Sequence, residues 1–215
     1  MKSGESAFDI FYLLFAIVIG VSSLRRRKDR IGALMGSAVL ILGIGDAFHL
    51  IPRVINYFGS GDYTAWLGFG KLVTSSTMTV FYLLMYRLWL RVYAEKEDRK
   101  LSVTIYILVA IRVLLCLLPQ NRWLQNNGSV LWGVLRNIPF VALGGMIVYL
   151  YYRKRAAIPS FRFVWLLVTL SFLFYMPVAV AASLVPLLGM LMLPKTVCYM
   201  LLIWCFRKYA FSYKI

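Results

Sequence analysis

Long apolar stretches alternate with short polar connections along the whole chain. The apolar stretches are residues 8–23, 31–54, 65–87, 102–118, 130–151, 163–187 and 189–207. A helix needs roughly 20 apolar residues to cross the hydrocarbon core of a bilayer, and these stretches are of that order. The pattern therefore predicts an all-α fold, a bundle of seven transmembrane helices that forms one domain over residues 1–215.

Composition supports lipid rather than water as the solvent. Apolar residues make up 61% of the 215 positions and charged residues 15%, against about half and about a quarter in soluble domains. Cys116, Cys198 and Cys205 all lie in apolar stretches without the spacing of metal ligands. We expect them to be buried free thiols, and we expect neither a metal site nor a cofactor.

Basic residues are distributed unevenly between the connections. Of 24 Lys and Arg residues, 17 lie in or beside the first, third and fifth connections and the C-terminal tail, whereas only Arg122 lies in the other three connections. Short loops rich in Lys and Arg stay in the cytoplasm. We therefore expect a multi-pass protein of the cell membrane, with its N-terminus outside and its C-terminus in the cytoplasm. The net charge of +16 then reflects membrane topology rather than nucleic-acid binding, and membrane lipids are the expected partners. The oligomeric state stays open.

Two parts of the chain resemble each other. Pro52 and Pro177 each lie late in the second helix of a three-helix unit, and residues 79–84 and 196–201 share a Thr-Val-x-Tyr-x-Leu pattern in the third helix. Both units begin on the same side of the membrane, with the fourth helix between them. The pattern is that of a parallel 3+1+3 repeat.

Seven ionisable residues lie inside the predicted spans, where each costs a few kcal/mol unless it finds a partner, water or a ligand. They are Asp46, His49, Arg53, Lys71, Arg112, Arg136 and Lys195. The expected topology places all seven in the outer half of the membrane, at the level of the polar Asn137, Tyr175 and Tyr199. Five cations there face Asp46, with Asp9 near the outer end of the first helix as a second anion. We predict a basic, outward-facing cavity lined by the seven ionisable residues together with Asn137, Tyr175 and Tyr199, ten residues in all.

Helix 31–54 is central to this prediction. Asp46, His49 and Arg53 are spaced so that they share one side of it, and Gly32 and Gly36 permit close packing of another helix. The alternative is purely structural: Asp46 pairs with Arg112 or Arg136 and holds two helices together.

Three functions fit this pattern. The first is binding, or also transport, of an anionic or polar small molecule, with arginines and Lys195 as countercharges. The second is a metal-free intramembrane enzyme that acts on a lipid or lipid phosphate, with His49 as general base oriented by Asp46. The third is a seven-helix sensor or receptor, because the layout is similar to that of opsins. Lys195 on the seventh helix invites comparison with the retinal-bearing lysine of opsins. It lies near the outer end of its helix, however, and the third helix lacks a matching carboxylate, so we do not expect a retinal protein.

Overall fold

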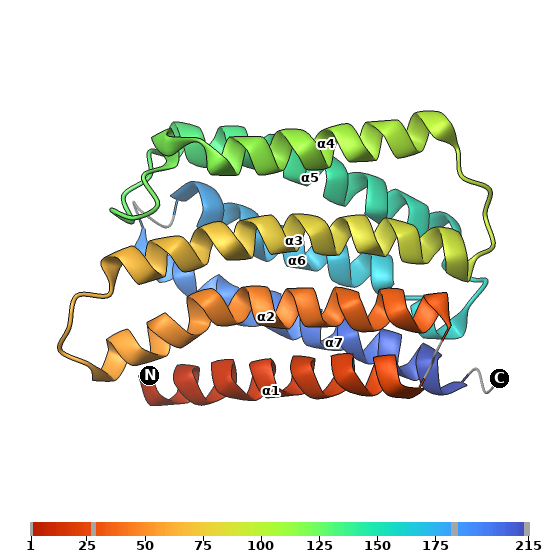
Figure 1. Cartoon of the computed structure of the whole chain (residues 1–215), viewed down its shortest axis with the longest axis horizontal. Coiled ribbons are helices and arrows are strands. Elements are labelled where there is room, and N and C mark those ends of the chain that lie inside the picture. Colours follow the sequence, from red (N-terminus) through yellow and green to blue (C-terminus); the bar gives the residue numbers. More distant parts are fainter. Residues whose placement is uncertain (1, 27–28, 182–184, 213–215) are drawn as a thin grey trace.

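Seven long α-helices run back and forth between two ends of the molecule in the computed structural model, which describes residues 2–26, 29–181 and 185–212 (Figure 1). The helices are α1 (Lys2–Arg26), α2 (Arg30–Phe58), α3 (Thr64–Val92), α4 (Arg99–Leu117), α5 (Val130–Arg153), α6 (Val164–Ala181) and α7 (Met192–Ser212). Short 3-10 helices η1 (Pro119–Asn121), η2 (Pro159–Phe161) and η3 (Pro186–Leu191) lie in three of the connections. These ranges contain no strand, so the predicted all-α class is confirmed.

The two ends of the bundle carry opposite termini. We call the end with the N-terminus the N-end; the α2–α3, α4–α5 and α6–α7 connections lie there too (Figure 1). The C-end carries the C-terminus and the other three connections. The end of the predicted span 163–187 includes residues 182–184, and the basic residues counted above include Arg27, Lys28 and Lys214. All of these lie outside the described residues.

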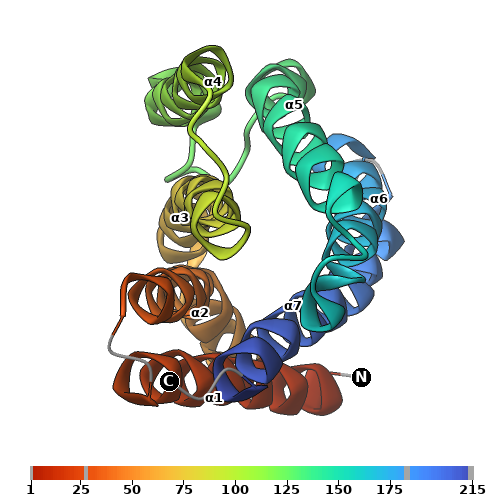
Figure 2. The ribbon, with the colours of Figure 1, turned by 90° about the vertical axis from the view of Figure 1, so that its right-hand side faces the viewer.

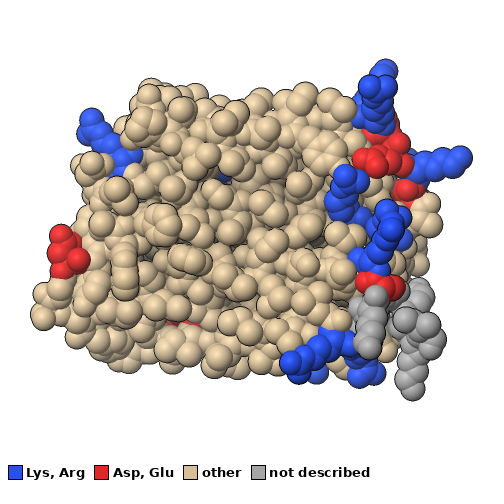
Figure 3. All heavy atoms as spheres, viewed as in Figure 1, with Lys and Arg blue, Asp and Glu red and all other residues tan. Residues whose placement is uncertain are grey.

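Six of the seven helices, all except α3, are long and apolar enough to cross a membrane. They identify the chain as a multi-pass membrane protein. Figure 3 agrees, because an almost uncharged band surrounds the middle of the visible face and the charged side chains gather at the ends, most of them at the C-end.

Helix α3 differs from the others in composition rather than in length. It has 29 residues, as α2 does, but residues 74–77 are four consecutive hydroxyl-bearing residues and Lys71 and Arg87 also lie within it. The Thr74 hydroxyl donates a hydrogen bond to the Gly45 carbonyl of α2 at 3.0 Å, which satisfies it inside the bundle. The hydroxyls of Ser76 and Thr77 donate to carbonyls of α3 itself. The seventh predicted span is α3, and these hydroxyls are satisfied within the bundle.

The helices form a closed circuit when viewed along the bundle (Figure 2). Helices α1 to α4 stack in chain order on one side, α5 to α7 curve around the other, and α7 packs against α1. The most extensive packing joins α2 to α3 and α1 to α2.

Glycines allow this close packing of α1, α2 and α3. A Cβ at Gly70 of α3 would overlap the Phe48 carbonyl of α2, and a Cβ at Gly36 of α2 would overlap the Leu24 side chain of α1. Gly43 likewise faces Ala16 of α1. The sequence predicted close packing of another helix at Gly36; in the structure that helix is α1, whereas Gly45 of α2 packs against Thr77 of α3.

Helix starts are defined by short acidic side chains. Asp29 and Asp98 accept hydrogen bonds from first-turn N–H groups of α2 and α4, at 2.8 and 2.9 Å, as N-cap residues do. Asp62 lies in the α2–α3 connection, where hydrogen bonds from the Thr64 hydroxyl and backbone N–H hold the pKa of its carboxyl below the ordinary 3.8.

Candidate functional site

A cavity of about 260 Å³ lies among the helices toward the N-end. Eight of the ten predicted site residues line it: Asp46, His49, Arg53, Lys71, Arg112, Arg136, Tyr175 and Lys195. Helices α2 to α7 thus each contribute at least one predicted residue, although these residues are far apart in the sequence. The lining also contains residues that were not in the predicted set, including Asp9, Thr74, Ser75, Met78, Trp123 and Phe140.

Asn137 and Tyr199, the other two predicted residues, do not line the cavity. Asn137 is buried and donates to the Gly133 carbonyl at 2.8 Å, while its own carbonyl accepts a hydrogen bond from the Tyr175 hydroxyl at 2.9 Å. The Tyr199 hydroxyl is 3.0 Å from that of Tyr82. Asn137 therefore positions a lining residue, Tyr175, and Tyr199 lies deeper in the bundle.

One wall of the cavity, from α1 and α2, is acidic. Asp46 accepts a hydrogen bond of 2.7 Å from the hydroxyl of Tyr12, which is fully buried. Asp9 is only 3% exposed, and its Oδ2 atom has no hydrogen-bond partner in the described part of the chain. Tyr12 was missed in the sequence, although Asp9 and Tyr12 are three residues apart and therefore share a helix face.

Asp46 and His49 do not form the expected hydrogen-bonded pair. The carboxylate of Asp46 binds Tyr12 instead, and Nδ1 of His49 is buried without a hydrogen-bond partner among the described residues. Lys71 and Lys195 act on the imidazole electrostatically. The arrangement does not supply the oriented general base that the enzyme hypothesis requires.

Arg53 is neutralised by a residue that the sequence analysis did not consider. It forms an ion pair with Glu5 of α1, and its Nε atom donates to the Tyr57 hydroxyl at 3.0 Å. Tyr57 in turn donates to Glu5 at 3.0 Å. Glu5 was overlooked because α1 begins at Lys2, six residues before the start of the predicted apolar stretch, so that Glu5 lies on the helix.

The opposite wall, from α4 and α5, is basic. Arg112 is 1% exposed and is the largest of the fully buried side chains. One of its Nη atoms donates to the backbone carbonyl of Arg136, and its guanidinium carbon lies 5.0 Å from the centre of the Phe140 ring. Arg136 donates to the Asn121 side chain at 2.7 Å and lies 4.4 Å from the centre of the Trp123 ring.

A proline lies close to this contact in α5. Pro139 lacks an N–H, so the carbonyl four residues earlier, that of Leu135, loses its helical donor. The Arg136 carbonyl, which accepts from Arg112, is the next one along the helix. Through this hydrogen bond Arg112 joins α4 to α5.

The charges of the two walls are not matched within the protein. The structural alternative had Asp46 paired with Arg112 or Arg136, but neither ion pair forms in the described structure. The Nε atoms of both arginines are buried without a hydrogen-bond partner there. The ammonium of Lys195 lies over the rings of Tyr175 and Tyr199, at 4.9 and 5.5 Å, and acts on Asp46 electrostatically. The cavity thus keeps an excess of positive charge.

A second cavity of about 300 Å³ lies beside the first, under the α4–α5 connection. The two share Lys71, Trp123 and Arg136 in their linings. Lys71 donates to Asn126 of this connection at 2.7 Å, and Arg122 adds another cation. We call this second cavity the vestibule.

Aromatic side chains fill the bundle on the C-end side of the cavity. The ring of Tyr82 lies 5.3 Å from that of Phe140 and 5.5 Å from that of Phe172, and Phe81 contacts Tyr199 at 6.0 Å, measured between ring centres. We call these five residues the aromatic floor. Within the described residues, no group of three His, Cys, Asp or Glu side chains is arranged to hold a metal ion.

Comparison with known proteins adds no assignment, since the chain matches no protein family, no curated protein and no solved structure.

Proposed function

We propose that this membrane protein binds a small anionic solute in the N-end cavity, with the N-end facing outward and the C-end in the cytoplasm. In this topology all seven helices cross the membrane, including the more polar α3. The orientation is supported by the distribution of basic residues, which gather at the C-end (Figure 3), because short Lys- and Arg-rich loops stay in the cytoplasm.

The observation that carries the proposal is the state of Arg112. A guanidinium that is 1% exposed is stabilised only where an opposite charge or several acceptors surround it. Within the described residues its hydrogen bonding is limited to one backbone carbonyl, and Arg136 beside it carries a second unpartnered Nε. A carboxylate, sulfate or phosphate group between the two arginines would accept hydrogen bonds from both, in the geometry that guanidinium groups favour.

The vestibule provides a route from the N-end. Lys71, Arg122 and Arg136 line it, and a narrow passage with charges of one sign concentrates ions of the opposite sign. An anion that enters there passes Trp123 and reaches Arg112.

Binding is better supported than transport, because the aromatic floor closes the cavity toward the C-end. Transport would require Tyr82, Phe140 and Phe172 to separate, and these rings pack edge-to-face or tilted at close range. A receptor for the same solute remains compatible with this site. The lipid enzyme loses its main support, since Asp46 binds Tyr12 rather than His49.

The internal repeat also gains support from one contact. Tyr82 and Tyr199 occupy the same position in the two Thr-Val-x-Tyr-x-Leu segments, and their hydroxyls are 3.0 Å apart. When equivalent residues of two units related by a twofold axis contact each other, they lie beside that axis. We infer that the axis runs through this pair, and that the cavity lies between the two three-helix units.

Thermal unfolding of the purified protein in detergent tests the binding proposal. Sodium phosphate, sulfate and acetate are added separately, with sodium chloride keeping the ionic strength constant. At least one anion should raise the unfolding temperature, because a ligand present at 100 times its Kd adds about 2.7 kcal/mol. Arg112→Gln and Arg136→Gln should abolish the increase.

Controls separate a lost site from a lost fold. Arg99→Gln removes an exposed cation at the C-end and should keep the full increase, and every variant must elute as a single species in gel filtration. An anion effect that persists in both cavity variants, or no effect on the native chain, would reject the proposed ligand. Orientation is tested separately in intact cells: a membrane-impermeant maleimide should label Gly61→Cys but not Lys96→Cys, and the reverse result overturns it.

A further inference from the structure

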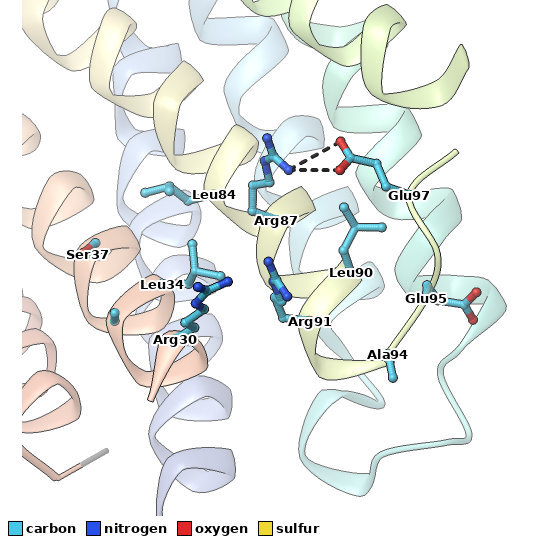
Figure 4. A pocket seen from close by; sticks show the side chains of 11 residues that line it. Arg30, Leu34, Ser37, Leu84, Arg87, Leu90, Arg91, Ala94, Glu95 and Glu97 are labelled. Carbon is cyan, nitrogen blue, oxygen red and sulfur yellow. Dashed lines mark hydrogen bonds and ion pairs between the residues drawn. The ribbon is translucent and has the colours of Figure 1, made fainter. Parts of the chain in front are cut away.

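A second hollow lies at the opposite end of the bundle. It is a groove of about 920 Å³ between the start of α2, the end of α3 and the α3–α4 connection (Figure 4). Its lining is Arg30, Ala33, Leu34, Ser37, Leu84, Arg87, Leu90, Arg91, Ala94, Glu95 and Glu97. None of these residues belongs to the predicted site or lines the N-end cavity.

Most charges around the groove are paired, and two are not. Arg87 forms an ion pair of 3.4 Å with Glu97, drawn as dashed lines in Figure 4, and Glu95 forms an ion pair with Lys154 of the α5–α6 connection. Arg30 and Arg91 have no hydrogen bond or ion pair from their side chains in the described structure. Figure 4 shows both extending into the space between α2 and α3. The groove therefore keeps two free positive charges.

Apart from Ser37, the remainder of the groove is apolar. Leu34 lies one turn beyond Arg30 on α2, and Leu84 lies about two turns before Arg91 on α3, so both lead from the arginines toward the middle of the bundle. A cationic rim that continues into an apolar floor, at the border of the uncharged band, complements a molecule with an anionic head and a hydrocarbon chain.

We propose that the groove binds one acidic phospholipid from the leaflet at the C-end. Its phosphate lies between Arg30 and Arg91, and one acyl chain runs along Leu34 and Leu84. Guanidinium groups favour phosphate oxygens, and a lipid with net negative charge balances two free cations better than a zwitterionic lipid does. The site is independent of the N-end cavity.

Native mass spectrometry of the delipidated full-length chain tests this inference. The protein in detergent is titrated with phosphatidylglycerol and with phosphatidylcholine of the same acyl chains, and the Kd of the first bound lipid is measured. Phosphatidylglycerol should bind more tightly. Combined Arg30→Gln and Arg91→Gln should weaken it about 25-fold, since a basic residue near an anionic lipid contributes about 1 kcal/mol and 1.4 kcal/mol is tenfold.

A matched control separates the groove from general surface charge. Combined Arg99→Gln and Lys100→Gln removes the same charge from exposed positions at the same end and should change the Kd less than about threefold. Ala33→Phe fills the groove without altering charge and should also weaken lipid binding, whereas the increase in unfolding temperature caused by anions in the N-end cavity should stay.

Three results overturn the inference. Equal weakening in the control pair would indicate nonspecific attraction. Equal affinity for phosphatidylcholine would remove the requirement for an acidic lipid. Displacement of bound lipid by millimolar inorganic phosphate would indicate a site for free anions rather than for an amphiphile.

Discussion

The N-end cavity and the C-end groove both contain arginines, but in opposite physical states. In the cavity, Arg112 is buried against an aromatic ring and a backbone carbonyl. At the groove, Arg30 and Arg91 are exposed and water reaches them. A buried guanidinium demands a specific partner, whereas an exposed one is satisfied by water. The comparison shows that burial decides what a cation indicates: Arg112 by itself requires a partner, whereas Arg30 and Arg91 indicate a ligand only together with the groove beside them.

Acidic side chains differ between the two ends in the same way. Glu5 and Arg53, near the cavity, are 22% and 21% exposed and share a tyrosine hydroxyl. Glu97 and Arg87, at the groove, are 47% and 42% exposed. The N-end pair should therefore contribute more to stability, because solvent screens it less.

The largest effect is expected where the backbones of α2 and α3 touch beside the cavity. In Gly70→Ala the new methyl group would overlap the Phe48 carbonyl and the His49 Cα atom, and backbone atoms cannot rotate away. We expect a loss of about 3 kcal/mol, measured by unfolding in mixed micelles. Gly145→Ala, whose methyl group would have no neighbour within 4 Å, should be neutral or stabilising. Similar losses in both variants would contradict the close contact.

An intermediate effect is expected from the tyrosine that supports Asp46. Tyr12→Phe removes the 2.7 Å hydrogen bond and leaves a carboxylate oxygen without its donor, so the free energy of unfolding should fall by about 2 kcal/mol. Tyr106→Phe is the counterpart in α4, where the hydroxyl is buried without a hydrogen-bond partner among the described residues. That change should cost nothing, and an equal loss in both would mean that the cost comes from removing a buried hydroxyl and not from the hydrogen bond to Asp46.

The smallest effect is expected for the difference in coupling free energy between the two ion pairs. Double-mutant cycles with Glu5→Gln and Arg53→Gln should give a coupling of about 1 kcal/mol, and cycles with Glu97→Gln and Arg87→Gln less than about 0.5 kcal/mol. Added salt should reduce the second coupling more strongly. A larger coupling at the C-end would reverse the comparison.

Much of the architecture was predictable because lipid imposes a simple rule on sequence. Segments 31–54 and 130–151 lie within α2 and α5, since only long apolar helices satisfy their own backbone in a bilayer. Ends were less predictable: α1 extends to Lys2 through polar residues, because a helix continues beyond the apolar layer where Glu5 finds a partner on α2. Helix α3 tolerates its run of hydroxyl-bearing residues because they bond inside the bundle: Thr74 donates to a carbonyl of α2, and Ser76 and Thr77 donate to carbonyls of α3 itself.

Most of the residues that line the cavity were predictable from the sequence, but the hydrogen bonds between them were not. The cost of burying ionisable groups identified His49, Arg112 and Lys195 as residues that need a shared polar space, and all three line one cavity. Spacing along one helix allowed Asp46 to contact His49, but the structure pairs it with Tyr12 of α1. Contacts between helices depend on helix rotation and separation, which a single helix does not encode.

The sequence alone determined that the chain is helical, that lipid is its solvent, and that the ionisable residues inside its helices, which cost free energy to bury, lie at one level of the bundle. These follow from local properties, namely hydropathy, length and the positions of ionisable residues. Only the tertiary structure decided that Glu5 neutralises Arg53, that Arg112 binds the carbonyl of Arg136, and that the groove beside Arg30 and Arg91 exists. Each of these depends on how neighbouring helices pack, and the energy of a buried charge is determined by atoms distant in the sequence.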